Sequence, residues 1–338
     1  MRDAAVRGVG ASCLVLTYHR VAELATDPQL LAVRPDTFRA QVEILARRYR
    51  VVALPRLLAD LREHALEPGS IALTFDDGYA DNPTAAAPVL VAAGLPATVF
   101  VSSGCVERGR EFWWDEVGRL VLDAPELPQQ VDLEVPDGSF AASVGPSEGP
   151  ADPHWDVLQP DSHPSHRLYR EVSSFLRPLP AAQREDALDQ LARAVGLARG
   201  VREAYRPMSP AEVAELDTLP GLEIGAHSRD HDVLALRTPE EQTAAVLDDK
   251  AALGALCGRT IETFSYPFGG RADFSTTTAR IVEDAGFAGA CANHPGLVKP
   301  WTDRFRLPRQ VVRDWDAETL RRRIDEWLGT PGAETDPA

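Results

Sequence analysis

The sequence is poor in several features, and each shortage argues against a class of protein. Its 338 residues include only four cysteines, Cys13, Cys105, Cys257 and Cys291, and no two of them form a CxxC pair. This spacing argues against a disulfide framework or a cysteine zinc site, and it favours buried free thiols. No run of about 18 apolar residues occurs, so a transmembrane helix is not expected.

Basic residues are also few relative to acidic ones. There are 35 Lys plus Arg against 51 Asp plus Glu, and the formal net charge is −16. Such a surface repels phosphate backbones and anionic lipid heads, so no nucleic-acid partner is expected. The apolar run from Ala11 to Thr17 is short and is followed by Tyr18-His19-Arg20 without a small-residue cleavage site. We interpret it as a strand rather than a secretory signal, and we expect a cytoplasmic location.

Short apolar runs alternate with longer helical patterns along most of the chain, which predicts a parallel sheet or a β/α barrel. The predicted strands are Cys13–Tyr18, Val51–Ala53, Ser70–Phe75, Ala97–Val101, Leu222–Ala226, Thr263–Tyr266, Ala288–Ala292 and Arg306–Val312. The predicted helices between and after them are Pro35–Tyr49, Leu54–His64, Pro83–Ala93, Thr238–Cys257, Thr276–Ala285 and Ala317–Leu328.

The alternation breaks within about residues 107–206, which we interpret as a mostly helical insertion. Pro and Ser cluster from Pro136 to Ser165, a pattern that predicts a long or poorly ordered loop. Helical patterns follow at Arg167–Leu176 and Ala181–Val195. We therefore expect one barrel-like domain over residues 1–328 that contains this insertion, and a disordered tail at 329–338.

Four predicted strands are each followed by a group that is able to do chemistry. These groups are His19, Asp76-Asp77-Gly78, His227 with His231, and Pro267-Phe268-Gly269-Gly270. Each has an ordinary explanation on its own: a core histidine, a solvated turn, two surface histidines, and a strand-to-helix turn. In parallel α/β architectures, however, the carboxyl ends of the strands share one face, and sites are built there. Their joint placement therefore predicts a single site.

Asp76 and Asp77 are costly to bury side by side unless a cation compensates them. One carboxylate is expected to bind a metal while the other stays free as a base. His227 and His231, expected where a loop turns onto a helix, add two imidazoles. With Asp77 they suit Zn²⁺ with an open position, although non-haem Fe(II) oxygenases use the same ligand types. A histidine such as His19 is suited to protonate a leaving amine near neutral pH.

Four segments resemble motifs of the polysaccharide deacetylases, the family 4 carbohydrate esterases. Leu73–Tyr79 is similar to the T-F-D-D-G motif, and Glu223–His231 is similar to the H-[ST]-x-x-H motif. Phe264–Gly269 resembles the third motif in the branch that reads F-[AS]-Y-P-[YF]-G. Val15–Val21 is similar to the Y-H-x-[VI] opening of that branch.

This resemblance implies an incomplete, distorted β/α barrel with about seven strands. It implies that Asp76 is the general base and His19 the general acid. It also implies that Asp77, His227 and His231 bind one divalent metal ion, which we expect to be Zn²⁺, with Ni²⁺, Co²⁺ or Fe²⁺ as alternatives.

The third motif is expected to contact the substrate and the oxyanion that forms during the reaction. The resemblance places Tyr266, Pro267 and Phe268 there, with the backbone N–H of Phe268 holding the oxyanion. Ser265 stands where a better-known branch, R-x-P-Y-G, has the arginine that orients the base. Arg309, in the Leu-Pro-Arg that recurs in this branch, is the favoured substitute, and we also assign it to the substrate region. The other candidates for this role are Arg271 and Arg313.

We therefore expect a metal-dependent hydrolase that removes an N-acetyl group from an amino sugar in a glycan, a lipid-linked sugar or a small glycoside. The alternatives are an O-deacetylase or deformylase of the same fold, an Fe(II) oxygenase, and a non-catalytic glycan-binding relative. Trp113 and Trp114 in the insertion either stack on a sugar ring or anchor the insertion. The expected partner is an N-acetylated carbohydrate, and the sequence leaves the oligomeric state open.

Overall fold

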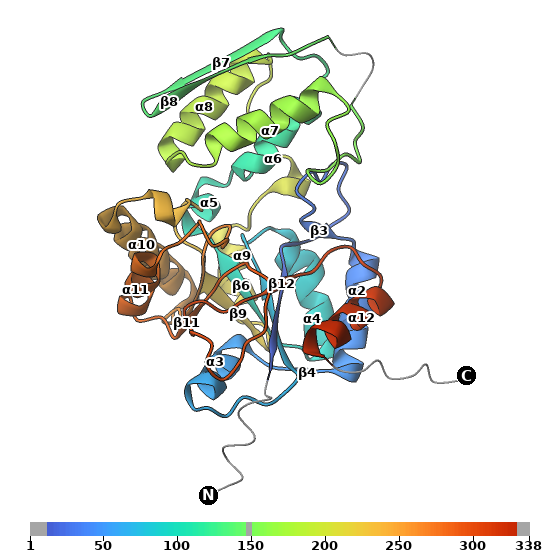
Figure 1. Ribbon diagram of the computed structural model, residues 1–338, viewed down its shortest axis with the longest axis vertical. Coiled ribbons are helices and arrows are strands. Elements are labelled where there is room, and N and C mark those ends of the chain that lie inside the picture. Colours follow the sequence, from blue (N-terminus) through green and yellow to red (C-terminus); the bar gives the residue numbers. More distant parts are fainter. Residues whose placement is uncertain (1–11, 147–150, 330–338) are drawn as a thin grey trace, which may run out of the picture.

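The computed structural model describes residues 12–146 and 151–329 (Figure 1). At its centre lies a parallel sheet with the strand order β11-β10-β9-β6-β5-β1-β12, and β4 also pairs with β5. These strands are β1 (Leu14–Tyr18), β4 (Arg50–Val51), β5 (Ser70–Phe75), β6 (Ala97–Val101), β9 (Leu222–Ala226), β10 (Thr263–Ser265), β11 (Gly289–Cys291) and β12 (Gln310–Val311). The predicted distorted, incomplete β/α barrel is confirmed. Residues 330–338 of the expected tail lie outside the described residues.

The central strands are continuous apolar runs because both of their faces are covered. Every residue of β1, β5 and β6 is buried, as is typical of parallel strands between helices and a barrel interior. Leu14 of β1 pairs with Ile71 of β5, and Ala97 of β6 pairs with Leu222 of β9. All of these pairs are parallel, so the strands end at one common rim.

One segment, Arg304–Val312, crosses between the two edges of the sheet, and we call it the closing segment. Its first part joins β11, because Leu307 N–H donates to Ala290 O and Leu307 O accepts from Ala292 N–H, both at 2.9 Å. Its last part joins β1, where Val312 N–H donates to Thr17 O at 2.9 Å. Only Gln310 and Val311 form a regular strand here, shorter than predicted, since the chain changes partner midway.

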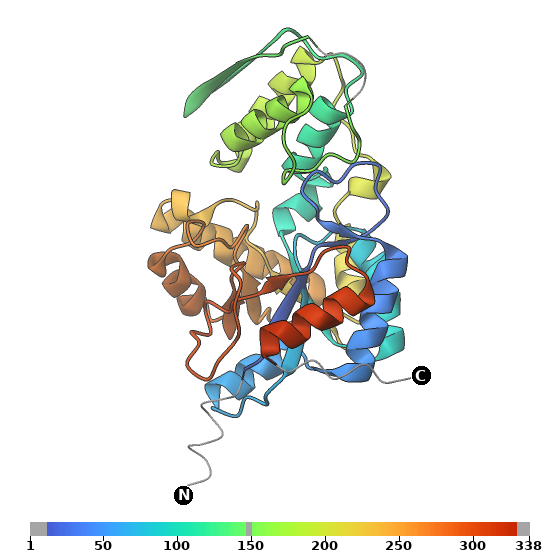
Figure 2. The same cartoon turned by 45° about the vertical axis from the view of Figure 1, so that its right-hand side comes forward.

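Helices cover the outside of the sheet. They are α2 (Pro35–Arg48), α3 (Leu54–Arg62), the π-helix Asn82–Ala86 with α4 (Ala87–Ala93), α9 (Pro210–Leu216), α10 (Pro239–Cys257), α11 (Thr276–Asp284) and α12 (Ala317–Leu328). Helix α10 packs with α11, and α2 packs with α4 and α12 on the opposite side (Figures 1 and 2). The capping box predicted before α10 is present, since Thr238 N–H donates to Glu241 Oε2 at 2.8 Å and Glu241 N–H to Thr238 Oγ1 at 3.2 Å.

The insertion forms a lobe above the carboxyl ends of the strands (Figures 1 and 2). Its elements are α5 (Ser103–Arg108), α6 (Trp113–Val117), the π-helix Gly118–Leu122, β7 (Gln130–Val135), β8 (Gly138–Ser143), α7 (Pro164–Leu176), α8 (Ala181–Ala194) and the 3₁₀ turn Glu203–Tyr205. Its apolar core is separate from those of the barrel and includes Val131, Leu133, Tyr169 and Leu188.

The prediction of a long loop over Pro136–Ser165 is wrong in its first part. Gly138–Ser143 forms β8, which pairs antiparallel with β7 in a hairpin. The sequence carried a signal for it: Val131 and Leu133 alternate with polar residues, and Pro136-Asp137-Gly138 is typical of a tight turn, with Pro136 and Asp137 as its two turn residues. The remainder of that stretch that the structure describes has no regular element before α7.

Within the described residues, each helix falls short of the length and apolarity that crossing a membrane demands. The four cysteines are free thiols, and three of them are buried while Cys257 is half-buried, as expected from their spacing. A short parallel pair, β2 (Arg20–Val21) with β3 (Ala32–Val33), extends the loop after β1. This loop contributes residues to the site described next.

Candidate metal centre

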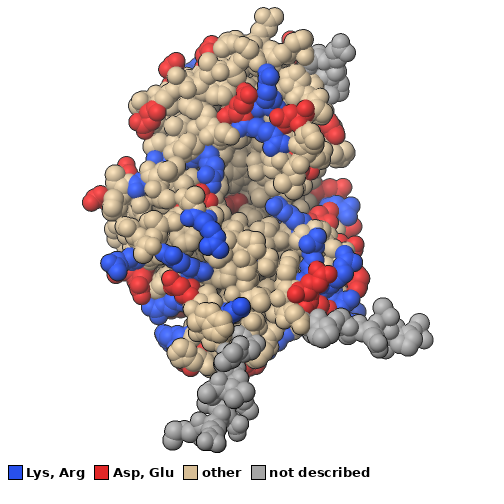
Figure 3. All heavy atoms as spheres, viewed as in Figure 1, with Lys and Arg blue, Asp and Glu red and all other residues tan. Residues whose placement is uncertain are grey.

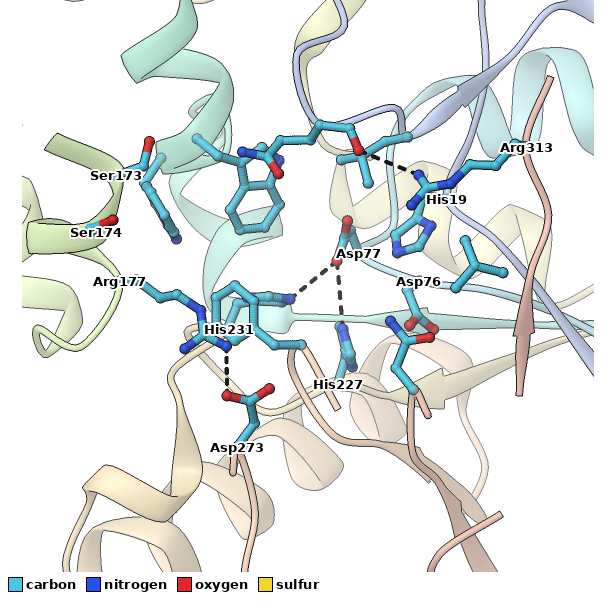
Figure 4. A pocket seen from close by; sticks show the side chains of 17 residues that line it. His19, Asp76, Asp77, Ser173, Ser174, Arg177, His227, His231, Asp273 and Arg313 are labelled. Atoms are coloured by element: carbon cyan, nitrogen blue, oxygen red, sulfur yellow. Dashed lines mark hydrogen bonds and ion pairs between the residues drawn. The ribbon is translucent and has the colours of Figure 1, made fainter. Parts of the chain in front are cut away.

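The predicted side chains meet at the common rim because each follows a strand of the barrel. His19 follows β1, Asp76 and Asp77 follow β5, and His227 follows β9. Strand β1 also positions the first aspartate, since Asp76 N–H donates to Tyr18 O at 3.0 Å. Figure 4 shows His19, Asp76, Asp77 and His227 directed into one pocket.

The turn after β5 needs an unusual backbone. Asp77 has φ +74° and Gly78 has φ +84°. A Cβ on Gly78 would lie 3.1 Å from a methyl of Val101 and 3.3 Å from Met208, so glycine is required for space as well as for its φ. Positive φ values also occur at Ser228, His231 and Phe268. Strained backbone is therefore concentrated at this site, where it aims the side chains.

Asp77, His227 and His231 form a buried cluster of potential metal ligands. One donor atom from each residue lies within 4.8 Å of the other two. Asp77 Oδ1 is 3.2 Å from His231 Nε2 and 3.5 Å from His227 Nε2 (Figure 4). A carboxylate and two imidazoles at this spacing match the set that holds a divalent ion with an open position. His227 and His231 lie in the loop after β9, and the next helical turn, a 3₁₀ turn, begins at Leu234.

His227 is held on both sides. Its Nδ1 lies 2.7 Å from Ser265 O, which can only accept, so Nδ1 carries a proton, and in the neutral imidazole Nε2 keeps the lone pair. Its backbone N–H donates to Asp249 Oδ2 at 2.8 Å, and Ser103 N–H donates to Asp249 Oδ1 at 2.8 Å. Gly225 allows β9 to pack closely against Phe100, since a Cβ at this position would lie 2.5 Å from the Phe100 ring.

Asp249 is a positioning residue that we did not predict. It lies on α10, 22 residues after His227 and outside any motif. A signal existed, because Val246, Asp249 and Leu253 share one buried helix face, and a carboxylate on an apolar face needs partners. Burial raises the pKa of Asp249 to about 6, although the N–H groups of Ser103 and His227 oppose this shift.

The charges of the cluster depend on one another. Burial would raise the pKa of Asp77, but the two imidazoles outweigh burial and hold that pKa far below its usual range. Burial would lower the pKa of His227, yet Asp76 and Asp77 raise it. Burial does lower the pKa of His231, which favours the neutral form that binds metals.

Asp76 is paired with Arg309 of the closing segment. The guanidinium donates to both carboxylate oxygens, at 2.8 Å and 2.6 Å, and Arg309 also donates to Ala292 O and Ser265 Oγ. Arg309 is 1% exposed, so it contacts Asp76 and not the substrate space, which corrects its assignment to the substrate region. Burial would raise the pKa of Asp76, but the charge of Arg309 outweighs it and the pKa falls. Ser265, which stands where the better-known branch has its arginine, thus accepts a hydrogen bond from Arg309.

His19 stands beside the two aspartates (Figure 4). Its backbone O accepts from Asn82 Nδ2 at 2.9 Å, which fixes the chain just after β1. Burial lowers the pKa of His19, and the charges of Asp77 and Asp76 act against that shift. The effect of burial is the larger one, so the pKa of His19 lies below its usual range.

The cluster opens into a pocket of about 400 Å³ between the barrel and the insertion. Figure 3 shows a hollow at this junction with basic side chains around its mouth. The insertion lines one wall with Trp113, Trp114, Ser173, Ser174 and Arg177. The volume is near the lower end of the range for small-molecule pockets, about 300 to 1,000 Å³.

Of the three residues expected from the third motif, only Phe268 lines this pocket among the described residues. Its ring packs against His231 at 4.6 Å between centroids, and its backbone N–H donates to no acceptor in the described chain. Tyr266 is fully buried, with its hydroxyl donating to Phe305 O at 2.9 Å, and it stacks on Phe274. Tyr266 therefore supports the turn and cannot reach a substrate, and Pro267 only shapes the same turn.

Trp113 and Trp114 are nearly buried, yet both line the pocket. Trp114 anchors the insertion, because its Nε1 donates to the hydroxyl of Tyr79 at 2.8 Å and its ring lies 4.9 Å from that of His231. The Tyr79 hydroxyl in turn donates to Asp115 at 2.7 Å. Trp114 therefore anchors the insertion, and both tryptophans lie at the boundary between the insertion and the site. Stacking on a sugar ring stays a prediction.

Comparisons with known proteins agree with this geometry. A sequence profile of the polysaccharide deacetylase family matches residues 63–132 and 200–290, which include Asp76, Asp77, His227 and His231 and omit most of the insertion. A search of curated proteins finds no match.

Several solved structures share the fold. One is the Streptococcus pyogenes deacetylase PplD in complex with acetate, with a TM-score of 0.59 and 15% identity over 93% of this chain and 98% of that one. Another is a de-N-acetylase from Aggregatibacter actinomycetemcomitans, with a TM-score of 0.56 and 12% identity over 93% and 99%. IcaB from Ammonifex degensii gives a TM-score of 0.55 and 17% identity over 94% and 97%. With the motifs, the ligand cluster and the profile match in one barrel, the chain belongs to the polysaccharide deacetylase family.

Proposed function

We propose that this protein is a metal-dependent hydrolase that removes the acetyl group from the nitrogen of an acetamido sugar. The observation that supports this most is that Asp76, fixed by Arg309, shares a pocket with the Asp77–His227–His231 cluster. One acid is thereby reserved for proton transfer while its neighbour belongs to the cluster. That division matches the needs of a metal-dependent hydrolase.

Asp77, His227 and His231 would hold the ion, and we propose Zn²⁺. The donor set fits, because both Nε2 atoms face the Asp77 carboxylate and the Nδ1 proton of His227 is fixed on Ser265 O. When bound there, a divalent ion polarises an acyl oxygen and lowers the pKa of water.

The remaining chemistry belongs to the side chains. Asp76, ionised because of Arg309, accepts a proton from water while the water oxygen bonds to the acetyl carbon. The N–H of Phe268 is free to stabilise the oxyanion that forms. His19 donates a proton to the sugar nitrogen as the C–N bond breaks, which releases acetate and a free amine. To complete the cycle, Asp76 releases the proton that it gained to solvent and His19 takes up a proton from solvent.

The test combines metal analysis with a screen for acetate release by the full-length chain loaded with Zn²⁺. We expect about one ion per chain and acetate from N-acetylated sugars. Release only from O-acetylated sugars would assign an esterase, and formate from formamido sugars would assign a deformylase. Oxygen consumption with a 2-oxoacid would assign an oxygenase. Sugar binding without hydrolysis or metal would overturn the proposal.

A further inference from the structure

Arg313 is a cation in the pocket that has no carboxylate partner among residues 12–146 and 151–329. It lies just beyond β12, lines the pocket, and stands beside His19 (Figure 4). Its guanidinium donates to Leu30 O and to Gln29 O, the latter at 3.3 Å. No Asp or Glu oxygen of the described residues lies within 4.0 Å of it, in contrast to Arg309 on Asp76. The sequence analysis considered Arg313 for orienting the base, but Arg309 fills that role.

Asp27 and Asp156, the two carboxylates whose charges act on Arg313, already accept other hydrogen bonds. Asp27 accepts the backbone N–H groups of Leu31 and Ala32, at 3.0 Å and 2.8 Å. Asp156 accepts Leu158 N–H and Gln159 Nε2, both at 2.8 Å. Burial lowers the pKa of Arg313, with Asp27 and Asp156 acting against it. A half-buried guanidinium without a counter-charge is costly, and a ligand that supplies one recovers that cost.

The other charged groups of the pocket are balanced. Asp76 is paired with Arg309, and Asp273 is paired with Arg177 at 2.5 Å. Asp77 belongs to the ligand cluster, where a divalent ion adds two positive charges. The loaded pocket is therefore positive within a protein whose net charge is −16. Trp113, on the same pocket, also has a buried indole N–H with no acceptor among the described residues.

We propose that the substrate carries an anionic group, a carboxylate or a phosphate, next to the acetamido sugar, and that Arg313 binds it. Arg313 is then a specificity-determining residue, because planar guanidinium groups bind both kinds of oxyanion with paired hydrogen bonds. The position beside His19 places this anion on the barrel side of the pocket, across from Ser173, Ser174 and Arg177 (Figure 4). That the ligand is a substrate rests on the proposed function. Binding of an anion by Arg313 does not, because it requires no reaction.

The experiment compares acetate release from matched sugars by the Zn²⁺-loaded full-length chain. The anionic substrates are N-acetylglucosamine 1-phosphate and a disaccharide of N-acetylglucosamine with a uronic acid, and the neutral one is methyl N-acetylglucosaminide. We expect kcat/KM at least about 10-fold higher for one anionic substrate, which identifies the phosphate or the carboxylate as the group. Arg313→Gln should reduce this preference about 10- to 100-fold, and Arg313→Lys should restore part of it. Arg39→Gln, on the exposed side of α2, is the control for charge.

Binding separates this proposal from the proposed reaction. Glucose 1-phosphate and glucuronate carry the two anions without an acetyl group, and calorimetry measures their binding to the original chain and to Arg313→Gln. Loss of binding in the variant supports the anion site even if no sugar releases acetate. An unchanged substrate preference in Arg313→Gln, with deacetylation intact, overturns the anion site and leaves the proposed function standing. A variant that alters only inhibition by acetate also overturns it, because the anion would then be the product.

Discussion

The barrel and the insertion contribute to the same pocket from different structural origins. The barrel collects His19, Asp76 and His227 from strands far apart in sequence, and the family profile covers the last two. The insertion builds its own core from a contiguous stretch and adds pocket walls such as Trp113 and Arg177. The candidate metal and acid–base residues thus come from the barrel, whereas the insertion adds walls to the pocket. Substitutions in the two regions should therefore affect different properties of the protein.

The largest effect is expected from the two adjacent aspartates of the barrel. Asp76→Asn removes the proton acceptor and should lower kcat by about 10²- to 10⁴-fold while the metal content stays near one ion per chain. Asp77→Asn removes a ligand and should lower both activity and metal content. Acetate release and elemental analysis of both variants measure this. Loss of metal from Asp76→Asn alone would contradict the division of labour between the two residues.

Breaking the buried ion pair should destabilise the barrel. Arg309→Gln leaves Asp76 buried without its counter-charge, and such losses cost about 3 to 5 kcal/mol. Chemical denaturation followed by tryptophan fluorescence gives the change in unfolding free energy. The double variant Arg309→Gln with Asp76→Asn should recover part of the loss, because it removes the uncompensated charge. A single variant as stable as the original chain would show that the pair does not hold the closing segment.

A matched pair of leucines compares the two cores directly. Leu188 of α8 and Leu253 of α10 are both fully buried, and replacement of either by alanine should cost about 2 to 5 kcal/mol. Leu188→Ala should weaken hydrogen-exchange protection in β7 and α8 while zinc binding persists. Leu253→Ala should weaken zinc binding as well, since α10 also carries Asp249. Equal loss of protection in both regions after Leu188→Ala would mean that lobe and barrel unfold as one unit.

The smallest effect concerns the junction of the two regions. Burial raises the pKa of Asp115 to about 7, against the opposing effects of Arg20 and Tyr79. A raised folded-state pKa means that the stability from this group is full below about pH 4 and is lost as the pH rises to about 7. The unfolding free energy of the original chain should therefore fall relative to that of Asp115→Asn as the pH rises over this interval. Thermal melts at pH 4, 5.5 and 8 measure it, and parallel curves would refute the raised pKa.

The sequence predicted the barrel and the ligand cluster well because their signals are local. Strand boundaries such as Ser70–Phe75 and Leu222–Ala226 follow from continuous apolar runs, and parallel strands place their ends together. The resemblance then named Asp77, His227 and His231, which the structure brings within 4.8 Å. The roles of Asp76 and His19 in a reaction stay predictions for the experiments above.

Tertiary contacts decided what the sequence could not predict. The hydroxyl of Tyr266 turns to Phe305 O because the ring stacks on Phe274, and no local pattern encodes that pairing. Asp249 reaches His227 across the helix–sheet interface. The hairpin of β7 and β8 was missed because proline and serine nearby outweighed a short alternating pattern.

The order of synthesis has a consequence for the closing segment. Arg309 leaves the ribosome 233 residues after Asp76, which is about 10 to 50 s of translation. Until then the nascent chain has the ligand cluster but no counter-charge for the acid that we propose as the base. We therefore expect the proposed hydrolysis only after the last strand has been translated and docked.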